Sequence, residues 1–306
     1  MTTHNSRLVH VAQVQQVARE IKRFELVSLD ETPLPAFSAG AHVTVTMRDR
    51  DHVWRNPYSL MGSPLDAKRY EISVLRVPQS RGGSAYMHRN VGIGSVLEIS
   101  APVNQFPLSN VGRKHIMIAG GIGITPFLAM LAQIKQDKRN FELHYAVRSV
   151  FDGAYFDVLR AADLPNVHLY RSDRGERIAL PGILASQPLG THLYVCGPQK
   201  MMDWALQTAR REGWPDESVH CERFSTQPSG KTANVKLARS GKAIYVGEHQ
   251  SILGTFSSDG VDAPSLCGDG QLLHNDHTLS VNEKLTGERA TTCATRLDGG
   301  SLTLDL

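Results

Sequence analysis

The 306-residue sequence has few cysteines and little net charge. It contains only four cysteines, which are far apart: Cys196, Cys221, Cys267 and Cys293. Such spacing does not indicate the disulfide framework of a small secreted protein. The formal net charge is only +3, and no stretch concentrates Lys and Arg as binding to a nucleic-acid backbone would require. The composition therefore argues against a nucleic-acid partner and against a disulfide-stabilised fold.

The sequence also lacks a secretory signal and an uninterrupted membrane-spanning run. Its first ten residues do not have the basic and then apolar order of a signal peptide, which predicts a cytoplasmic protein. Residues 116–134 carry no charge over 19 positions, close to the length that spans a bilayer. However, three glycines and a proline interrupt this run, where a spanning helix would be continuous. We therefore expect a buried strand, a glycine turn and a helix here, and no membrane partner.

The length and the first strand patterns predict a multi-domain protein that begins with a barrel. A chain of 306 residues favours two or three domains, and 41% apolar with 21% charged residues is typical of globular proteins. Residues 42–49 and 70–77 alternate apolar with polar side chains, and turn-forming residues fill the gaps. We assign residues 1–110 to a small antiparallel β-barrel.

The periodicity changes near residue 114. From there, strand patterns at residues 115–120, 141–147, 167–172 and 191–198 alternate with helix patterns at 125–136, 154–162 and 199–212. This alternation predicts an α/β doubly wound sheet over residues 111–224, with residues 219–224 as its last strand. Residues 225–231 have the composition of a linker, and short strand patterns in residues 232–306 predict a third, small module with a sheet.

The strongest local motif is the segment IAGGIGITPFLAM. A strand runs into Gly120, Gly121 and Gly123, and the next helix holds Thr125 and Pro126 in its first turn. Such a turn offers unpaired N–H groups at the positive end of the helix dipole, where a pyrophosphate can bind. Glycine allows the backbone to approach the ligand closely. The order differs from G-x-G-x-x-G, and a tight packing turn explains this segment equally well when it is taken alone.

The second motif ends a later strand of the same sheet with Cys196, Gly197 and Pro198. Ligands of doubly wound folds bind at the carboxyl ends of the strands. Cys196 and Gly197 are therefore expected at the same crevice as Gly120 and Gly121. Cys196 is a candidate for contact with a nicotinamide ring, and the competing interpretation is a small buried hydrophobic residue.

The third motif pairs WRNPYSL, residues 54–60, with SRGGSAYMH, residues 80–88. An arginine, a serine and a glycine-rich turn can provide donors to a phosphate, while an aromatic ring covers an apolar cofactor face. Taken separately, the Arg81 turn also fits a simple hairpin, and Tyr58 also fits an ordinary barrel residue.

In this order, the motifs resemble the phthalate dioxygenase reductase family, within the ferredoxin–NADP reductase superfamily. The resemblance covers nearly the whole chain, and it is carried by Tyr58-Ser59-Leu60, Arg81-Gly82-Gly83-Ser84, Gly120-Gly121-Ile122-Gly123-Ile124-Thr125-Pro126, Cys196-Gly197-Pro198 and Glu222-Arg223-Phe224. Members join an FMN-binding barrel, an NADH-binding domain and a carboxy-terminal plant-type [2Fe-2S] ferredoxin domain, which has a β-grasp fold. They pass electrons from NADH to a terminal oxygenase.

The resemblance also implies roles for individual residues. The flavin would be held by Arg55, Tyr58, Ser59, Leu60 and the Gly82-Gly83-Ser84 turn, with Phe224 stacked on its ring. The dinucleotide would lie over Gly120, Gly121, Gly123, Thr125, Pro126, Cys196, Gly197 and Pro198, with its adenosine side at Arg148 and Ser149. Ser59 and Cys196 would be nearest to the hydride transfer from nicotinamide C4 to flavin N5, which depends mainly on positioning. The family implies FMN in preference to FAD and NADH in preference to NADPH. Arg148, Arg171 and Arg174 keep NADPH open, because an arginine can bind a 2′-phosphate.

One departure from the family concerns the flavin motif. The family usually has one residue between the arginine and the tyrosine, whereas Asn56 and Pro57 both separate Arg55 from Tyr58 here. The direction in which Arg55 points is therefore left open.

A second departure concerns the third module. A plant-type [2Fe-2S] cluster requires four thiolates, with C-x4-C-x2-C spacing and a distant fourth. Only Cys267 and Cys293 remain for residues 232–306, with 25 residues between them. By resemblance they are remnants of the outer two ligand positions, and the loop with the other two is deleted. His274 and His277 are alternative ligands, although a loop histidine is more commonly solvated.

These observations leave three hypotheses. The first is an NADH-dependent flavoprotein reductase that serves a terminal oxygenase. The second is a reductase without a cluster that reduces free flavin, a haem protein or a separate ferredoxin directly. The third is a non-catalytic module derived from a reductase, against which the nearly intact nucleotide motifs weigh.

Overall fold

The structure is a computed structural model that divides the chain into two compact units, Met1–Phe224 and Ser225–Leu306. The residues that it describes are 6–30, 32–50, 52–66, 68–78, 80, 82–224, 232–237, 239–246, 255–256, 280–281, 284–285 and 300–304.

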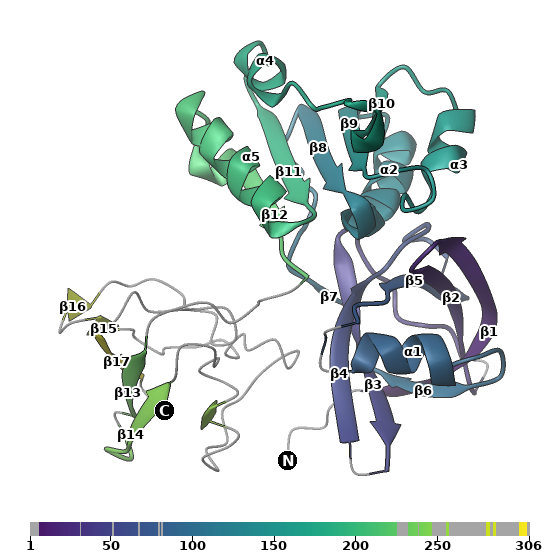
Figure 1. Cartoon of the computed structure of the whole chain (residues 1–306), viewed down its shortest axis with the longest axis vertical. Helices are drawn as coiled ribbons and strands as arrows, with labels where there is room; N and C mark the ends of the chain where they lie inside the picture. Colours follow the sequence, from purple (N-terminus) through teal and green to yellow (C-terminus); the bar gives the residue numbers. More distant parts are fainter. Residues whose placement is uncertain are drawn as a thin grey trace. The chain divides into compact units, whose positions relative to one another are not determined.

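The first unit begins with a seven-stranded antiparallel sheet (Figure 1). Its strands are β1 (Arg7–Ala18), β2 (Ile21–Ser28), β3 (Ala41–Asp49), β4 (His52–Ser59), β5 (Arg69–Leu75), β6 (Val96–Ile99) and β7 (Val103–Asn104). The order is β4-β3-β6-β1-β2-β5, with β7 on β3. A bridge from Met61 to Glu71 joins the end of β4 to β5, so the sheet curls into the predicted barrel.

Alternating side chains form the core of the barrel. Val43, Val45 and Met47 of β3 are fully buried in one cluster with side chains from β1, β2, β5 and β6. Residues of a strand alternate between its two faces, so every second residue of β3 can enter the core. The helix α1 (Gly83–Asn90) adds its buried Met87 to the same cluster. Each such side chain stabilises the fold by about 1.5–3 kcal/mol.

A parallel five-stranded sheet follows in the order β10-β9-β8-β11-β12. Its strands are β8 (Lys114–Gly120), β9 (Asn140–Val147), β10 (Val167–Arg171), β11 (Thr191–Cys196) and β12 (Val219–Glu222). Its helices are α2 (Thr125–Asp137), α3 (Phe156–Ala161), α4 (Leu180–Ala185) and α5 (Gln199–Arg211), with short 3-10 turns η1 (Gly121–Ile124), η2 (Ser172–Arg174) and η3 (Asp216–Ser218). This is the predicted doubly wound sheet, and its strand order reverses between β8 and β11.

The helices cover both faces of this sheet (Figure 1). Buried residues of α2 and α3 share one cluster with β8, β9 and β11, whereas α4 and α5 pack on the opposite face. Phe106 and Leu108, which connect the barrel to β8, belong to the same cluster as Phe127 of α2 and Tyr194 of β11. The barrel and the parallel sheet therefore share apolar packing, which fits their division into one compact unit.

The second unit contains another five-stranded sheet, in the order β14-β13-β17-β15-β16. Its strands are β13 (Ala233–Leu237), β14 (Ala243–Val246), β15 (Ser280–Val281), β16 (Lys284–Leu285) and β17 (Gly300–Leu304). β13 is parallel to β17, and the other pairs are antiparallel. A sheet was expected in this module, and its β-grasp fold stays a prediction. The predicted linker and the candidate ligands Cys267, Cys293, His274 and His277 lie outside the described residues.

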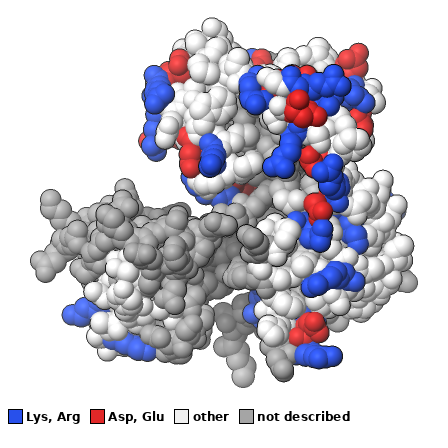
Figure 2. Space-filling view, viewed as in Figure 1, with Lys and Arg blue, Asp and Glu red and all other residues white. Residues whose placement is uncertain are grey.

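Charge is mixed on the face of the first unit seen in Figure 2, where Lys and Arg side chains alternate with Asp and Glu. Within the described ranges, no helix is long and apolar enough to cross a membrane.

Candidate active site

The glycine turn after β8 combines close packing with open space. A Cβ atom on Gly123 would lie 2.2 Å from the carbonyl oxygen of Cys196, and one on Gly120 would lie 2.7 Å from Cδ of Pro198. Both glycines are therefore required for the approach of the β8 and β11 ends. Gly121 differs, because its φ is +53° and a Cβ there would meet no atom within 4 Å. Of the three glycines in this turn, Gly120 and Gly123 therefore serve close packing, and Gly121 faces open space.

Thr125 and Pro126 begin α2, as the motif predicts. Thr125 is buried, and its Oγ1 donates a hydrogen bond of 3.0 Å to the carbonyl oxygen of Ile122. Pro126 lies in the first turn, where a missing N–H is tolerated. The Thr125 hydroxyl is already engaged within the turn, so a ligand here would be bound through backbone N–H groups.

Arg148 and Ser149 directly follow β9, at the same carboxyl edge of the sheet. Ser149 Oγ donates to Asp152 Oδ2 over 2.7 Å, and the backbone N–H of Asp173 donates to the Arg148 carbonyl oxygen over 2.9 Å. Asp173 also forms an ion pair of 3.1 Å with Arg171. Of the three candidate arginines for a 2′-phosphate, Arg171 therefore already has a carboxylate partner, whereas no ion pair of Arg148 or Arg174 occurs among the described residues.

The register of β4 determines where the flavin-motif residues point. Asn56 and Tyr58 pair with Val45 and Val43 of β3, so they share the barrel-core face. The Nδ2 atom of Asn56 donates to the hydroxyl of Tyr58 over 3.2 Å, and burial raises the pKa of Tyr58 to about 12. Arg55 is the residue before Asn56, so its side chain projects from the other face of β4. It is exposed on the opposite face of the strand from Tyr58.

The predicted phosphate turn lies against the same strand. Gly82 has φ +110° and precedes α1, which begins without a side-chain cap. A Cβ on Gly83 would lie 2.7 Å from Nδ2 of Asn56, and one on Gly82 would lie 3.2 Å from the Trp54 ring. The Ser84 hydroxyl accepts a hydrogen bond of 3.2 Å from the Val77 N–H. Trp54 and Asn56, and not Arg55, are therefore the β4 side chains next to this turn.

Ser59 and Glu222 connect the barrel to the parallel sheet. Ser59 is buried at the end of β4, and its Oγ donates to Oε2 of Glu222 over 3.3 Å. Burial raises the pKa of Glu222 to about 8, and the hydrogen bond from Ser59 opposes this shift only in part. Glu222 ends β12 opposite Cys196, which in turn pairs with Ala119 of β8. Sequence reasoning gave Glu222 no role, although the carboxyl-end rule applied to the last strand would have found it.

Three further residues that were predicted to contact a cofactor differ in their exposure. Cys196 is fully buried, and burial raises the pKa of its thiol. Leu60 is also fully buried, and its N–H donates to the Ala41 carbonyl oxygen over 2.8 Å. Phe224, the last residue of the first unit, is 40% exposed. The Phe224 ring is therefore available for stacking. The buried Leu60 side chain is not, and this residue is held in the barrel by its backbone hydrogen bond to Ala41.

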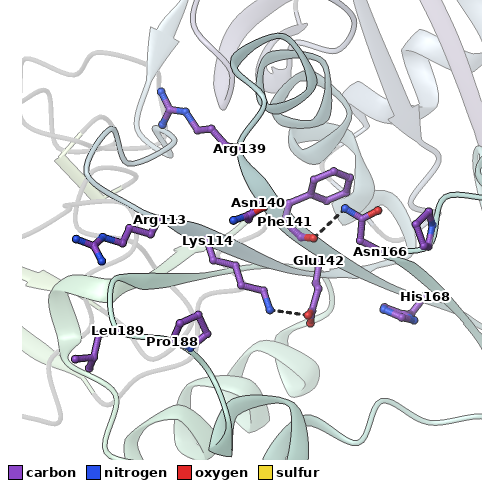
Figure 3. Close-up of a pocket in the computed structure, with 11 residues that line it drawn as sticks. Arg113, Lys114, Arg139, Asn140, Phe141, Glu142, Asn166, His168, Pro188 and Leu189 are labelled. Carbon is purple, nitrogen blue, oxygen red and sulfur yellow. Dashed lines mark hydrogen bonds and ion pairs between the residues drawn. The ribbon is translucent and has the colours of Figure 1, made fainter.

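A separate pocket of about 940 Å³ lies at the amino ends of the parallel strands (Figure 3). Lys114 and Glu142 face each other within it at 2.7 Å, while the guanidinium of Arg113 points outward (Figure 3). Ligands of doubly wound sheets bind at the carboxyl ends, so this pocket is not the predicted nucleotide site.

Comparisons with known proteins show which proteins this chain is similar to. A family model described as "Dimethylamine monooxygenase subunit DmmA-like, N-terminal domain" matches residues 100–219. The haem-dependent oxidative N-demethylase beta subunit of Ectopseudomonas mendocina is 37% identical, with 97% of this chain and 98% of that protein covered. The carnitine monooxygenase reductase subunit of Escherichia coli is also 37% identical, with the same coverage. A solved structure of phthalate dioxygenase reductase aligns with a TM-score of 0.73 and 30% identity over 98% of both chains.

The chain belongs to the phthalate dioxygenase reductase family. That family is of the ferredoxin reductase type, and its named members are oxidoreductase components of oxygenase systems. The solved phthalate dioxygenase reductase is described as a modular structure for electron transfer from pyridine nucleotides to [2Fe-2S]. The chain is therefore a redox enzyme component.

Proposed function

We propose that the chain takes hydride from NADH onto FMN and passes electrons, one at a time, to a terminal oxygenase. The contact between Ser59 of β4 and Glu222 of β12 is the observation that carries this proposal. It brings the end of the flavin-motif strand to the carboxyl edge of the nucleotide sheet. Cys196 and Ala119 continue the same row across that edge, and the open Gly121 turn follows Ala119 by two residues. A flavin and a dinucleotide bound at these places would share one crevice.

The residues present fit a flavin. The uncapped start of α1 leaves first-turn N–H groups for a phosphate, and Asn56 lies beside them. Tyr58, Ser59 and the partly exposed Phe224 are the candidates to hold the ring system. A bound flavin would supply the chemistry that converts a two-electron hydride into single electrons.

Ser59 and Glu222 would manage the proton of this reaction. Oxidation of one NADH to NAD⁺ releases two electrons and one proton. Because the pKa of Glu222 is raised to about 8, its carboxyl group can take up or release a proton near neutral pH. Ser59 Oγ donates a hydrogen bond to this carboxyl group, so the carboxyl group lies at the end of β4. A group with this pKa is mostly protonated at neutral pH, so we assign Glu222 the role of a proton donor that takes a proton back when the electrons leave the site.

A plant-type [2Fe-2S] cluster does not fit the cysteines of this chain. Cys196 and Cys221 belong to β11 and β12 of the first unit, so residues 225–306 contain only Cys267 and Cys293. A cluster of this kind requires four thiolates. The electron route that we propose therefore leads from the flavin directly to the acceptor.

This shortage of thiolates favours a second candidate for the acceptor. A relative with 37% identity is named a haem-dependent oxidative N-demethylase subunit. A haem protein is therefore the second acceptor to test, beside an iron–sulfur oxygenase. The amine-directed names of the family model and of both relatives make an oxygenase of alkylated amines the first partner to assay.

The test begins with purified full-length protein incubated with FMN or FAD. We expect a yellow protein that oxidises NADH with an artificial one-electron acceptor, and that uses NADPH less well. Arg148→Ala and Arg174→Ala should then change NADPH use more than NADH use. A protein that stays colourless and does not oxidise either nucleotide would refute the proposal and would favour a non-catalytic module. Adding free flavin, a haem protein or a separate ferredoxin identifies the acceptor class.

A further inference from the structure

Tyr145 of β9 has a buried hydroxyl group that the site described above does not use. Its oxygen lies 3.1 Å from the carbonyl oxygen of Gly121 and 3.0 Å from that of Ala154. The residue is fully buried in the cluster that β8, β9 and α2 share, and burial raises the pKa of its hydroxyl group. The hydroxyl group therefore keeps its hydrogen at neutral pH and shares it between the two carbonyl oxygens.

These two carbonyl groups belong to different parts of the proposed nucleotide site. Gly121 begins the turn after β8, where we expect the pyrophosphate. Ala154 lies near the end of the loop that follows β9, and this loop starts with Arg148 and Ser149 on the expected adenosine side. One hydroxyl group thus connects both the glycine turn and this loop to β9.

The hydrogen bond to Gly121 determines which way one donor of the turn points. The peptide group between Gly121 and Ile122 is trans, and in a trans peptide the C=O and N–H groups point in opposite directions. Because the Gly121 carbonyl group points to the buried Tyr145 hydroxyl, the Ile122 N–H points away from that core. Ile122 is the second residue of η1, and the first N–H groups of a helical turn have no partner within it. A Cβ atom on Gly121 would meet no atom within 4 Å, so a ligand has room beside this peptide group.

We propose that Tyr145 is a positioning residue of the nucleotide site, and that its hydroxyl group aims the Ile122 N–H at the pyrophosphate of the bound dinucleotide. This inference rests on the proposed function, because it requires the dinucleotide to lie over the glycine turn. Glycine adopts positive and negative φ with similar ease, so Gly121, with φ +53°, does not by itself fix the peptide group that follows it. The hydrogen bond from Tyr145 fixes that orientation before the ligand binds, which lowers the cost of binding.

Tyr194 of β11 provides a matched comparison in the same sheet. It is fully buried in the same cluster as Tyr145, and its hydroxyl group accepts a hydrogen bond of 2.7 Å from the Ser109 N–H. Ser109 precedes β8, whereas the glycine turn follows that strand. Replacing either tyrosine by phenylalanine removes one hydrogen bond from a buried backbone group, but only Tyr145 bonds to the turn.

Ser73 of β5 separates the turn from the loop. Its Oγ atom lies 2.7 Å from the hydroxyl oxygen of Tyr155, which directly follows Ala154. Ser73→Ala therefore loosens the end of the loop and leaves the hydrogen bond of Tyr145 to Gly121 in place. An effect that passes through the loop should appear in this variant, whereas an effect on the Ile122 N–H should not.

The experiment compares flavin-loaded, full-length wild type with Tyr145→Phe, Tyr194→Phe and Ser73→Ala. Oxidation of NADH with an artificial acceptor gives KM and kcat. Because KM equals Kd only when chemistry is slow relative to dissociation, competitive inhibition by ADP-ribose, which has the pyrophosphate but no nicotinamide, is measured as well. We expect Tyr145→Phe to raise KM for NADH and the inhibition constant of ADP-ribose about fivefold, which corresponds to about 1 kcal/mol. Its kcat and its Kd for FMN should stay within about twofold of wild type, as should all four quantities in the other two variants.

Each outcome supports or overturns the inference. Wild-type KM and inhibition constant in Tyr145→Phe would overturn it and leave the proposed function intact. An equal rise in Tyr194→Phe would also overturn it, because the loss of any buried hydroxyl group would then suffice, and an equal rise in Ser73→Ala would assign the effect to the loop. If wild type oxidises neither nucleotide and does not bind ADP-ribose, the proposed function fails and the inference fails with it.

Urea denaturation establishes that each variant folds, and the two phenylalanine variants should lose similar stability. If Tyr145→Phe does not fold, Ile122→Pro tests the same donor, because proline removes the N–H itself and is tolerated in the first turn of a helix. It should raise the same two constants, and unchanged constants would overturn the inference.

Discussion

Replacing Gly121 and Gly123 by alanine, one at a time, separates the two roles of the glycine turn. Gly121 has φ +53° and faces open space, whereas a Cβ on Gly123 would lie 2.2 Å from the Cys196 carbonyl oxygen and 2.7 Å from the Gly197 nitrogen. The two substitutions add the same methyl group within one turn. They differ in what that methyl group meets and in the backbone, because only Gly121 of the two has a positive φ.

The structure sets different stability costs for the two variants. Gly121→Ala should reduce the free energy of unfolding by about 1–2 kcal/mol, because alanine is strained in the left-handed region. Gly123→Ala meets backbone atoms that cannot rotate away, so the end of β11 must move. Overpacking of this kind costs about 1–3 kcal/mol, and backbone obstruction puts this variant at or above the upper end. Urea denaturation of the flavin-loaded proteins measures both values.

Gly121→Ala, which should lose less stability than Gly123→Ala, should nevertheless have the larger effect on the binding of NADH. The new methyl group of Gly121→Ala projects into the space where we expect the pyrophosphate, so KM for NADH should rise about tenfold, or about 1.4 kcal/mol. Flavin content should not change. Gly213→Ala is the matched control, because Gly213 also has positive φ, +75°, and open space, but follows α5 on the other side of the sheet. It should show the strain without the change in KM.

Two results would refute this reasoning. If KM for NADH is the same in Gly121→Ala and Gly213→Ala, the turn does not cradle the nucleotide. If Gly123→Ala is no less stable than Gly121→Ala, the close approach of β8 and β11 does not depend on the missing side chain.

Three further predictions follow from the same structure. Glu222 has a folded-state pKa of about 8, above its ordinary value of 4.5, so its contribution to stability is present below pH 4.5 and is lost as pH rises through 8. Between pH 6 and pH 9, Glu222→Gln should therefore lose less stability than wild type in urea denaturation. Equal losses would contradict the prediction. His115 has a pKa lowered from 6.5 to about 4, so its contribution to stability is present above pH 6.5 and is lost as pH falls towards 4. His115→Phe should remove up to about 3 kcal/mol of this acid destabilisation, measured as the free energy of unfolding against pH. If the pH dependence of that free energy is unchanged in the variant, the ring is not buried in its neutral form. In a fluorescence titration with FMN, Asn56→Ala should raise Kd about tenfold, through loss of a polar contact worth about 1–1.5 kcal/mol, whereas Arg55→Ala should leave Kd within about twofold of wild type. The reverse order would mean that Arg55 reaches the flavin despite its position on the strand.

The sequence determined much of the local structure. The alternation in residues 42–49 predicted a strand, and β3 covers this segment, although both faces of its first half are buried. The change to alternating strands and helices predicted the parallel sheet, because parallel strands need crossover connections. The glycine turn before α2 and the cysteine count were also readable from the sequence. These features depend on backbone geometry and composition, which act over a few residues.

The tertiary structure decided which residues meet. Ser59 and Glu222 are separated by 163 positions, and only the packing of the barrel against the parallel sheet brings them to 3.3 Å. The two residues between Arg55 and Tyr58 left the direction of Arg55 open, and the unbroken register of β4 with β3 placed Asn56 beside the phosphate turn in its stead. The separate roles of Gly121 and Gly123 likewise depend on the neighbouring strand β11. Contacts between distant segments follow from the packing of whole elements, which no local pattern in the sequence specifies.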